Sequence, residues 1–150
     1  MITESIKAKG SLTLVLKDEH GNVKQQDEVN LVVDTGLAYI ASRMKDTTLA
    51  AMSHMAIGTS DVDPAAGQTT LLNEVARVAL DSTSLVTTTA TNDSIQYVAT
   101  FGAGTGTGGI KEAGLFNDTS AGTMLCRTEF AVINKGAADT LAITWKVTIA

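Results

Sequence analysis

The glycine-rich stretch GAGTGTGG, residues 102–109, is the first place to look for chemistry, because such loops can wrap a phosphate. Gly104, Gly106 and Gly109 match the G-x-G-x-x-G spacing of dinucleotide-binding loops and follow a strand-like run. That fingerprint needs a helix after the glycines, where free backbone N–H groups meet the phosphate. The following segment instead reaches Gly114 and a turn cluster, and no Gly-Lys-Ser/Thr completes a P-loop. The stretch is therefore predicted to be a turn between two strands.

Candidates for nucleophilic and acid–base catalysis are scattered along the chain. Ser53 adjoins His54, but neighbouring residues on a strand point to opposite faces. Cys126 is the only cysteine, which rules out a disulfide within the chain, and its apolar strand-like surroundings predict a small buried hydrophobe. Glu112 and Glu129 form a carboxylate pair on paper, yet nothing in the sequence places them together.

Metal ligands are equally sparse. Asp61 and Asp63 have a D-x-D spacing in the loop that holds the only proline, but a Ca²⁺ site needs about six to eight oxygen ligands. Beyond Asp63 this loop offers only Gln68 and threonines, so we interpret it as a turn. His20 and His54 make a poor metal set with a single cysteine. The sequence thus predicts no catalytic, cofactor-binding or metal-binding residues, and no enzyme.

Alternating apolar runs separated by turn clusters form most of the chain. Residues 11–17 and 23–33 flank the turn DEHGN and predict a β-hairpin. The run over 140–150 predicts a strand whose core face carries Leu141, Ile143, Trp145 and Val147. Further strands are predicted over residues 53–60, 77–80, 84–89, 94–101 and 124–133. Many short strands of this kind predict an all-β fold, an antiparallel and jelly-roll-like β-sandwich.

One short α-helix is expected near residues 36–45. Leu37, Ile40, Ala41 and Met44 follow the i, i+3, i+4, i+7 spacing of one apolar helix face. Asp34 or Thr35 would cap its first turn. Glu74 and Arg77, further along, are expected to pair with each other or to lie in an interface.

Length and charge narrow the class of protein. The 150 residues suit one β-sandwich domain over 1–150, with residues 1–10 as an extended N-terminal arm. A net charge of −5 without a Lys/Arg cluster speaks against nucleic-acid binding, and no apolar run is long enough for a membrane span. Charged residues make up 18%, fewer than in an average soluble domain, which suits a chain packed beside copies of itself or a partner.

Five segments carry a resemblance to a known family: NLVVDTGLAYIASRM, MSHMAIGTS, AAGQTTLLNEVARVAL, YVATFGAGTGTGGIKEAGLF and GTMLCRTEFAVINKGAADTLAITWKVTI. Together they resemble small structural proteins of tailed bacteriophages over residues 11–149. The elements AIGTS, EAGLF and ITWKVTI occur in that family in the same order. The resemblance implies a non-enzymatic virion protein, assembled in the host cytoplasm, with no catalytic residues to carry over.

Two positions on the virion are candidates for this protein. A compact chain without a fibrous repeat or a heptad shaft favours a capsid decoration (cement) protein that binds the major capsid protein and stabilises the shell. The alternative is a tail, neck or fibre module that attaches to the host or to other tail proteins. By analogy with cement proteins the resemblance implies a homotrimer. Residues 102–109 or 1–10 are the expected contacts with neighbours.

Overall fold

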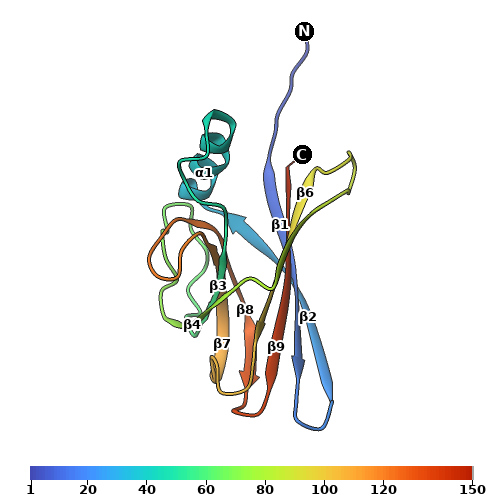
Figure 1. Cartoon of the computed structure of the whole chain (residues 1–150), viewed down its shortest axis with the longest axis vertical. Coiled ribbons are helices and arrows are strands. Elements are labelled where there is room, and N and C mark those ends of the chain that lie inside the picture. Colours follow the sequence, from blue (N-terminus) through green and yellow to red (C-terminus); the bar gives the residue numbers. More distant parts are fainter. Residues whose placement is uncertain (150) are drawn as a thin grey trace.

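The computed structural model describes residues 1–149 and shows an all-β molecule with one helix at its edge (Figure 1). Nine antiparallel strands form one sheet of order β4-β3-β7-β8-β2-β1-β9-β6-β5. The elements are β1 (Ala8–Lys17), β2 (Val23–Val32), α1 (Asp34–Lys45), β3 (His54–Gly58), β4 (Glu74–Ala79), β5 (Ser82–Val86), β6 (Ser94–Phe101), β7 (Gly108–Phe116), β8 (Met124–Lys135) and β9 (Thr140–Ile149). The predicted antiparallel β-sandwich with one short helix is confirmed.

The sheet curls into two layers because two stretches belong to both. β2 pairs with β1 along most of its length and then, at Leu31 and Val32, with β8. The outermost strands β4 and β5 follow each other directly in the chain. Between them the Leu80 N–H donates to the Ser53 carbonyl at 2.9 Å, and the Asp81 N–H donates to the Val98 carbonyl at 2.7 Å. The chain therefore crosses from one layer to the other at this edge, and the layers enclose the core.

The predicted core face of the last strand is confirmed. Leu141, Ile143, Trp145 and Val147 all lie in the main hydrophobic core. The one polar group of this face has a partner, since the Trp145 Nε1–H donates to Asn30 Oδ1 at 2.7 Å. A buried indole N–H without an acceptor would cost free energy, so this bond fixes the register of the hairpin against β9.

The helix is docked through its first turn. The Thr35 hydroxyl donates to the Met124 carbonyl at 2.9 Å. Gly36 lies so close to β8 that a Cβ atom there would overlap the Leu125 carbonyl oxygen. The expected side-chain cap is not formed, because Val33 occupies the N-cap position and the Thr35 hydroxyl bonds to β8 instead.

The predicted apolar face of the helix is only partly right: Ile40 packs against the core, but Leu37, Ala41 and Met44 are exposed. Gly36 and Tyr39 are the buried residues, whereas Leu37 is 49% and Met44 89% exposed. The reason is geometric: the helix docks closely on β8 at Gly36, so the side that carries Tyr39 and Ile40 faces the core, while the far end of the helix projects beyond the sandwich (Figure 1). Helical periodicity shows which residues share a face but not which face meets the protein.

Candidate functional site

The glycine stretch is structural. β6 ends at Phe101 and β7 begins at Gly108, so a strand stands where a phosphate-binding loop would need a helix, as predicted. Gly104 and Gly106 have positive φ angles, which suit glycine. The Lys135 ammonium donates to the Gly102 carbonyl at 2.8 Å, and Gly106 lies against Ile57. The loop thus joins the two layers at the end of the sandwich opposite the helix.

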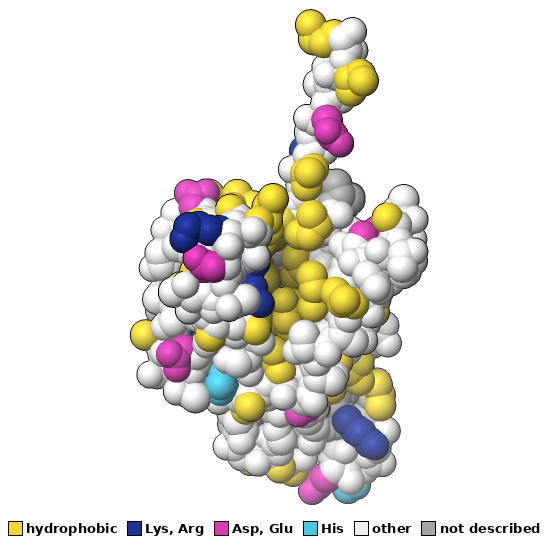
Figure 2. Space-filling view, turned by 45° about the horizontal axis from the view of Figure 1, so that its top comes forward, with side chains coloured by type: hydrophobic (Ala, Val, Ile, Leu, Met, Phe, Trp, Pro, Cys, Tyr) yellow, Lys and Arg dark blue, Asp and Glu magenta, His cyan; other side chains and the backbone are white. Residues whose placement is uncertain are grey.

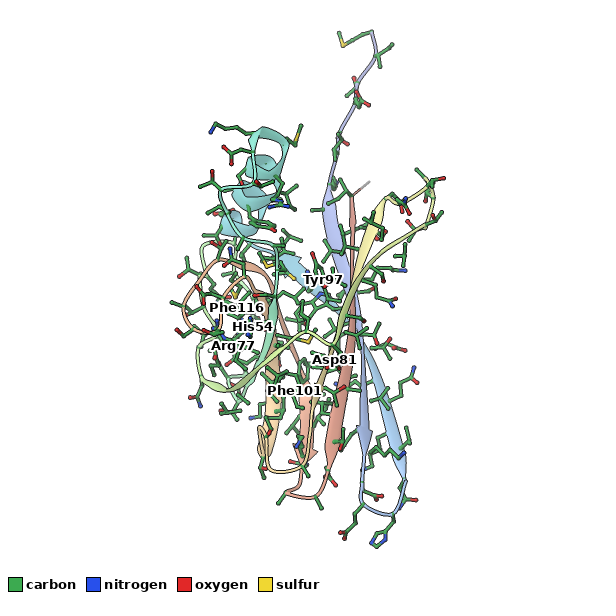
Figure 3. All side chains as sticks on the ribbon, in the orientation of Figure 1. His54, Arg77, Asp81, Tyr97, Phe101 and Phe116 are labelled. Carbon is green, nitrogen blue, oxygen red and sulfur yellow. The ribbon has the colours of Figure 1, made fainter. Side chains whose placement is uncertain are left out.

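The serine and histidine come together without forming a catalytic set. Ser53 Oγ lies 2.8 Å from His54 Nδ1, so the prediction that they point apart is wrong; Ser53 precedes β3 and is free of the strand's alternation. In the β3–β7 register His54 faces Phe116 (Figure 3), and within residues 1–149 no carboxylate bonds to its ring. Cys126 is buried as predicted, and burial raises the pKa of its thiol, which disfavours the nucleophilic thiolate.

The carboxylate pair is brought together by strand register. Glu112 on β7 stands opposite Glu129 on β8. Glu112 is nevertheless fully committed: Oε2 accepts from Arg127 Nη2 at 2.9 Å and from Arg127 Nε at 3.1 Å, and Oε1 accepts from the Asn73 N–H at 2.7 Å. The Glu112 and Arg127 side chains are both 0% exposed. This ion pair lies under the loop of residues 59–73 and holds it to the sheet, which is an architectural role.

The D-x-D loop is organised by the same arginine. Arg127 Nη1 donates to the Val62 carbonyl at 2.9 Å and to Gln68 Oε1 at 3.1 Å. Asp61 and Asp63 are themselves exposed. In the part of the chain that the structure describes, no group of three or more His, Cys, Asp or Glu residues is placed to hold a metal ion. Hydrogen bonds from Arg127 and within the loop, between Gln68 and residues 63–65, hold the turn in shape.

Glu74 and Arg77 form the internal pair that the sequence suggested. Arg77 Nη2 lies 2.7 Å from Glu74 Oε1, and the guanidinium stacks 3.8 Å above the Phe116 ring (Figure 3). Arg77 Nη1 also donates to the carbonyls of Asp118 and Ala121. These hydrogen bonds hold the turn after β7 against β4, so the role of Arg77 is to stabilise the fold.

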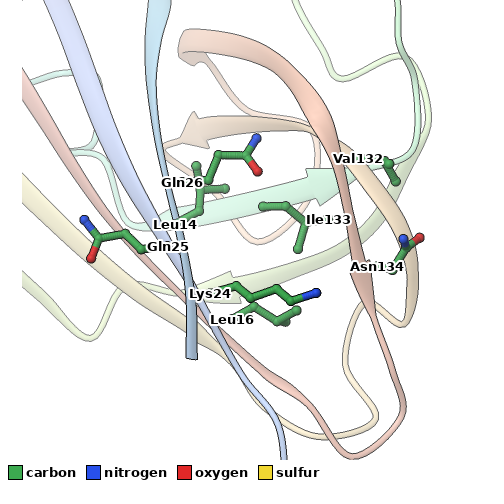
Figure 4. Close-up of a pocket in the computed structure, with 8 residues that line it drawn as sticks. All are labelled: Leu14, Leu16, Lys24, Gln25, Gln26, Val132, Ile133 and Asn134. Carbon is green, nitrogen blue, oxygen red and sulfur yellow. The ribbon is translucent and has the colours of Figure 1, made fainter. Parts of the chain in front are cut away.

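Two surface depressions are poor binding sites. The first, of about 120 Å³, lies where the β1–β2 hairpin parts from β8, between Leu14 and Ile133 (Figure 4). It is smaller than the roughly 300 Å³ at which small-molecule pockets begin. The second, of about 470 Å³, is an open depression lined mainly by polar residues, among them Lys9, Lys146 and residues 88–89. Neither combines a lining of mainly apolar residues with useful volume.

A third depression combines an apolar lining with useful volume, and we call it the apolar groove. It has a volume of about 330 Å³ and lies between α1 and the ends of β6 and β9. Figure 2 shows hydrophobic side chains gathered in a hollow that leads away from the base of the N-terminal segment. Aromatic and aliphatic side chains line it, chiefly Tyr39 and Ile40 from α1 and Ile95, Tyr97, Val147 and Ile149 from the sheet.

The charge in the apolar groove is a single cation. Arg43 is the charged residue of its lining, and its Nη1 donates to the Leu49 carbonyl at 3.0 Å. Among residues 1–149 Arg43 forms no salt bridge. Burial raises the pKa of the Tyr97 phenol, with Tyr39 adding to the rise and the charge of Arg43 opposing it. The groove is thus an apolar depression with one positive charge in its lining.

The N-terminal arm begins beside this groove. Residues 1–7 form no strand and are exposed, whereas residues 8–10, which we expected in the arm, belong to β1. Ala8 pairs with Ile149, a residue of the groove lining, so the arm leaves the sandwich at the rim of the groove. Ile2 is 94% and Ile6 73% exposed. The sequence pattern indicated the arm but not the groove, whose walls come from distant parts of the chain.

Comparison with known proteins gives one family. A family model described as "Phage tail-collar fibre protein, N-terminal" matches residues 25–147. The match runs from β2 to β9 and covers most of the sandwich. No curated protein and no solved structure matches the chain significantly. The described residues contain no helix long and apolar enough to cross a membrane.

Proposed function

The chain belongs to the phage tail-collar fibre protein family, in its N-terminal region, and from this membership we propose that it is the module that joins a fibre to the phage tail. A structural role in the tail and a place in the virion follow from the family itself. The finer assignment, attachment at the tail collar, is our proposal. The family match over residues 25–147 is the observation that carries it.

The match favours the tail alternative and gives no support to capsid decoration or to the major capsid protein as partner. The expectation of decoration came from the lack of a fibrous repeat in 150 residues. The matched family describes the N-terminal region of a fibre protein, and a shaft is not expected within that region. The missing repeat therefore does not distinguish the two stations.

The build of the molecule suits attachment by binding alone. The buried pair of Glu112 and Arg127 lies within one continuous nine-stranded sheet. Two apolar features of the molecule, the exposed isoleucines of the arm and the apolar groove, lie together at one end. Exposed apolar side chains gathered in one place are typical of a protein–protein contact. We further propose that the domain acts without catalysis and assembles as a homotrimer.

Copy number tests the proposed station. In purified virions, quantitative mass spectrometry should find a few to a few dozen copies of this chain per particle, counted against the major capsid protein. Gold-labelled antibodies against the domain should mark the tail, while antibodies against the major capsid protein mark the shell as the control. Hundreds of copies per particle, with gold on the shell, would overturn attachment to the tail and restore decoration.

A further inference from the structure

We propose that the N-terminal arm, residues 1–7, of one copy lies in the apolar groove of a neighbouring copy. This inference rests on the proposed oligomer and names the contact that holds it together. Three features of the molecule support it: the pattern of the arm, the complementary lining of the groove, and the direction in which the arm leaves its own sandwich.

The arm has the pattern of a segment made to lie in a groove. In an extended chain alternate residues share a face and lie about 7 Å apart, so Ile2, Glu4 and Ile6 point one way. Thr3 and Ser5 point the other way, toward solvent when the arm is bound. In the single copy both isoleucines are left in water, an unfavourable arrangement that a partner surface would relieve.

The groove complements this face in shape and charge. Its volume of about 330 Å³ is roughly twice that of an engineered apolar cavity that takes up benzene, so it has room for two aliphatic side chains. Its cation, Arg43, has no ion-pair partner within residues 1–149, and Glu4, between the two isoleucines, has none either. A bound arm would bring an unpaired carboxylate to an unpaired guanidinium in a partly desolvated site, where such a pair is stronger than in water.

The direction of the arm points to a neighbour and not to its own groove. The arm continues the line of β1 past the end of β9 and away from the body (Figure 1). Filling its own groove would need a sharp reversal near Lys7 and Ala8. The first nine residues contain neither glycine nor proline, the residues that favour tight turns. Gly10 cannot provide the reversal, because it is held in β1 between Asn30 and Val147.

The first test removes the apolar face of the arm and measures self-association. Sedimentation equilibrium of the intact chain should show an oligomer that Ile2→Asp with Ile6→Asp weakens about a hundredfold, that is, about tenfold or more per isoleucine. The matched control is Thr3→Asp with Ser5→Asp, which adds the same charge on the opposite face and should change the association constant by less than about fivefold. All four positions lie outside the core, so Trp145 fluorescence should report unchanged unfolding in each variant.

The second test exchanges the charges. Glu4→Arg and Arg43→Glu should each weaken association, and the two together should restore it toward the wild-type value. A general effect of net charge cannot produce this rescue, because the double variant carries the wild-type net charge. A double variant as weak as the singles would remove the ion pair from the proposal.

The third test identifies whose groove is filled. Copies carrying Ile6→Cys are mixed with tagged copies carrying Ile40→Cys under mild oxidation; Cys126 does not compete because it is buried. A disulfide between tagged and untagged chains is expected. No bond between chains, or an oligomer that survives Ile2→Asp with Ile6→Asp, overturns arm exchange while leaving the proposed oligomer standing. A wild-type chain that stays monomeric at all concentrations overturns both.

Discussion

Replacing Arg127 by methionine should destabilise the fold by about 3–5 kcal/mol, the usual cost of breaking a buried ion pair from one side. The structure predicts a cost near the upper end of this range. Glu112 and Arg127 are both 0% exposed, so the remaining carboxylate cannot turn to water. The arginine also serves the Val62 carbonyl and Gln68, and both would lose a charged donor. The loop of residues 59–73 should loosen together with the loss of stability.

The double variant Glu112→Leu with Arg127→Met separates the pair from its surroundings. It removes both charges, so its cost should fall below the sum of the two single costs by about 2 kcal/mol. It is not expected to reach zero, because the N–H groups of Leu72 and Asn73 lose their acceptor. Urea unfolding followed by the fluorescence of Trp145, the only tryptophan, gives the free energies.

The neighbouring Lys111→Met variant is the matched control. Lys111 Nζ lies 3.8 Å from Asp61 Oδ2 in the same loop, but this pair is exposed, with side-chain exposures of 36% and 75%. Its loss should cost less than about 1 kcal/mol. If Arg127→Met costs no more than this control, or if the two single costs simply add, the ion pair does not hold the loop and the interpretation is refuted.

Three further predictions follow from other contacts. Gly36→Ala should destabilise the protein although alanine favours a helix by about 1 kcal/mol, because its Cβ meets the Leu125 carbonyl; a gain in thermal stability would refute the close approach. The N–H groups of Ala90, Thr89 and Thr88 hold the pKa of Asp93 below its usual range. The Asp93 carboxylate therefore stabilises this turn fully above the ordinary carboxyl pKa, and this stabilisation is lost only as pH falls through the lower pKa of the folded state. Asp93→Ala should speed amide hydrogen exchange of residues 88–90 already at neutral pH, because their N–H groups lose their acceptor. Unchanged exchange would show that Asp93 does not hold the turn. Cys126 should react with a thiol reagent only on unfolding, and rapid labelling of the native protein would show that β8 is not closed.

Local patterns predicted most of the elements, because the cause of each is local, although the strands expected over 77–80 and 84–89 lie at Glu74–Ala79 and Ser82–Val86. Alternation placed Leu141 to Val147 in the core, and the Gly21–Asn22 pair marked the hairpin turn. The face of α1 was predicted correctly only at Ile40, because the docking of the helix depends on one close contact, Gly36 against β8, which periodicity does not encode.

The candidate sites depended on register, which the sequence does not state. Glu112 meets both Arg127 and Glu129 only because β7 and β8 pair as they do. A signal was present, since Glu112 and Arg127 both lie in largely apolar strands, where charged residues are almost never fully buried unless they are paired. The apolar groove was beyond prediction, because α1, β6 and β9 contribute its walls from distant parts of the chain.

The proposed station is tested most directly by a cryo-electron microscopy reconstruction of the tail of the intact virion. The account predicts that a body with the shape of this nine-stranded sandwich lies at the tail collar, at the base of a fibre. Density for the domain on the outer surface of the capsid, with none at the collar, would contradict it.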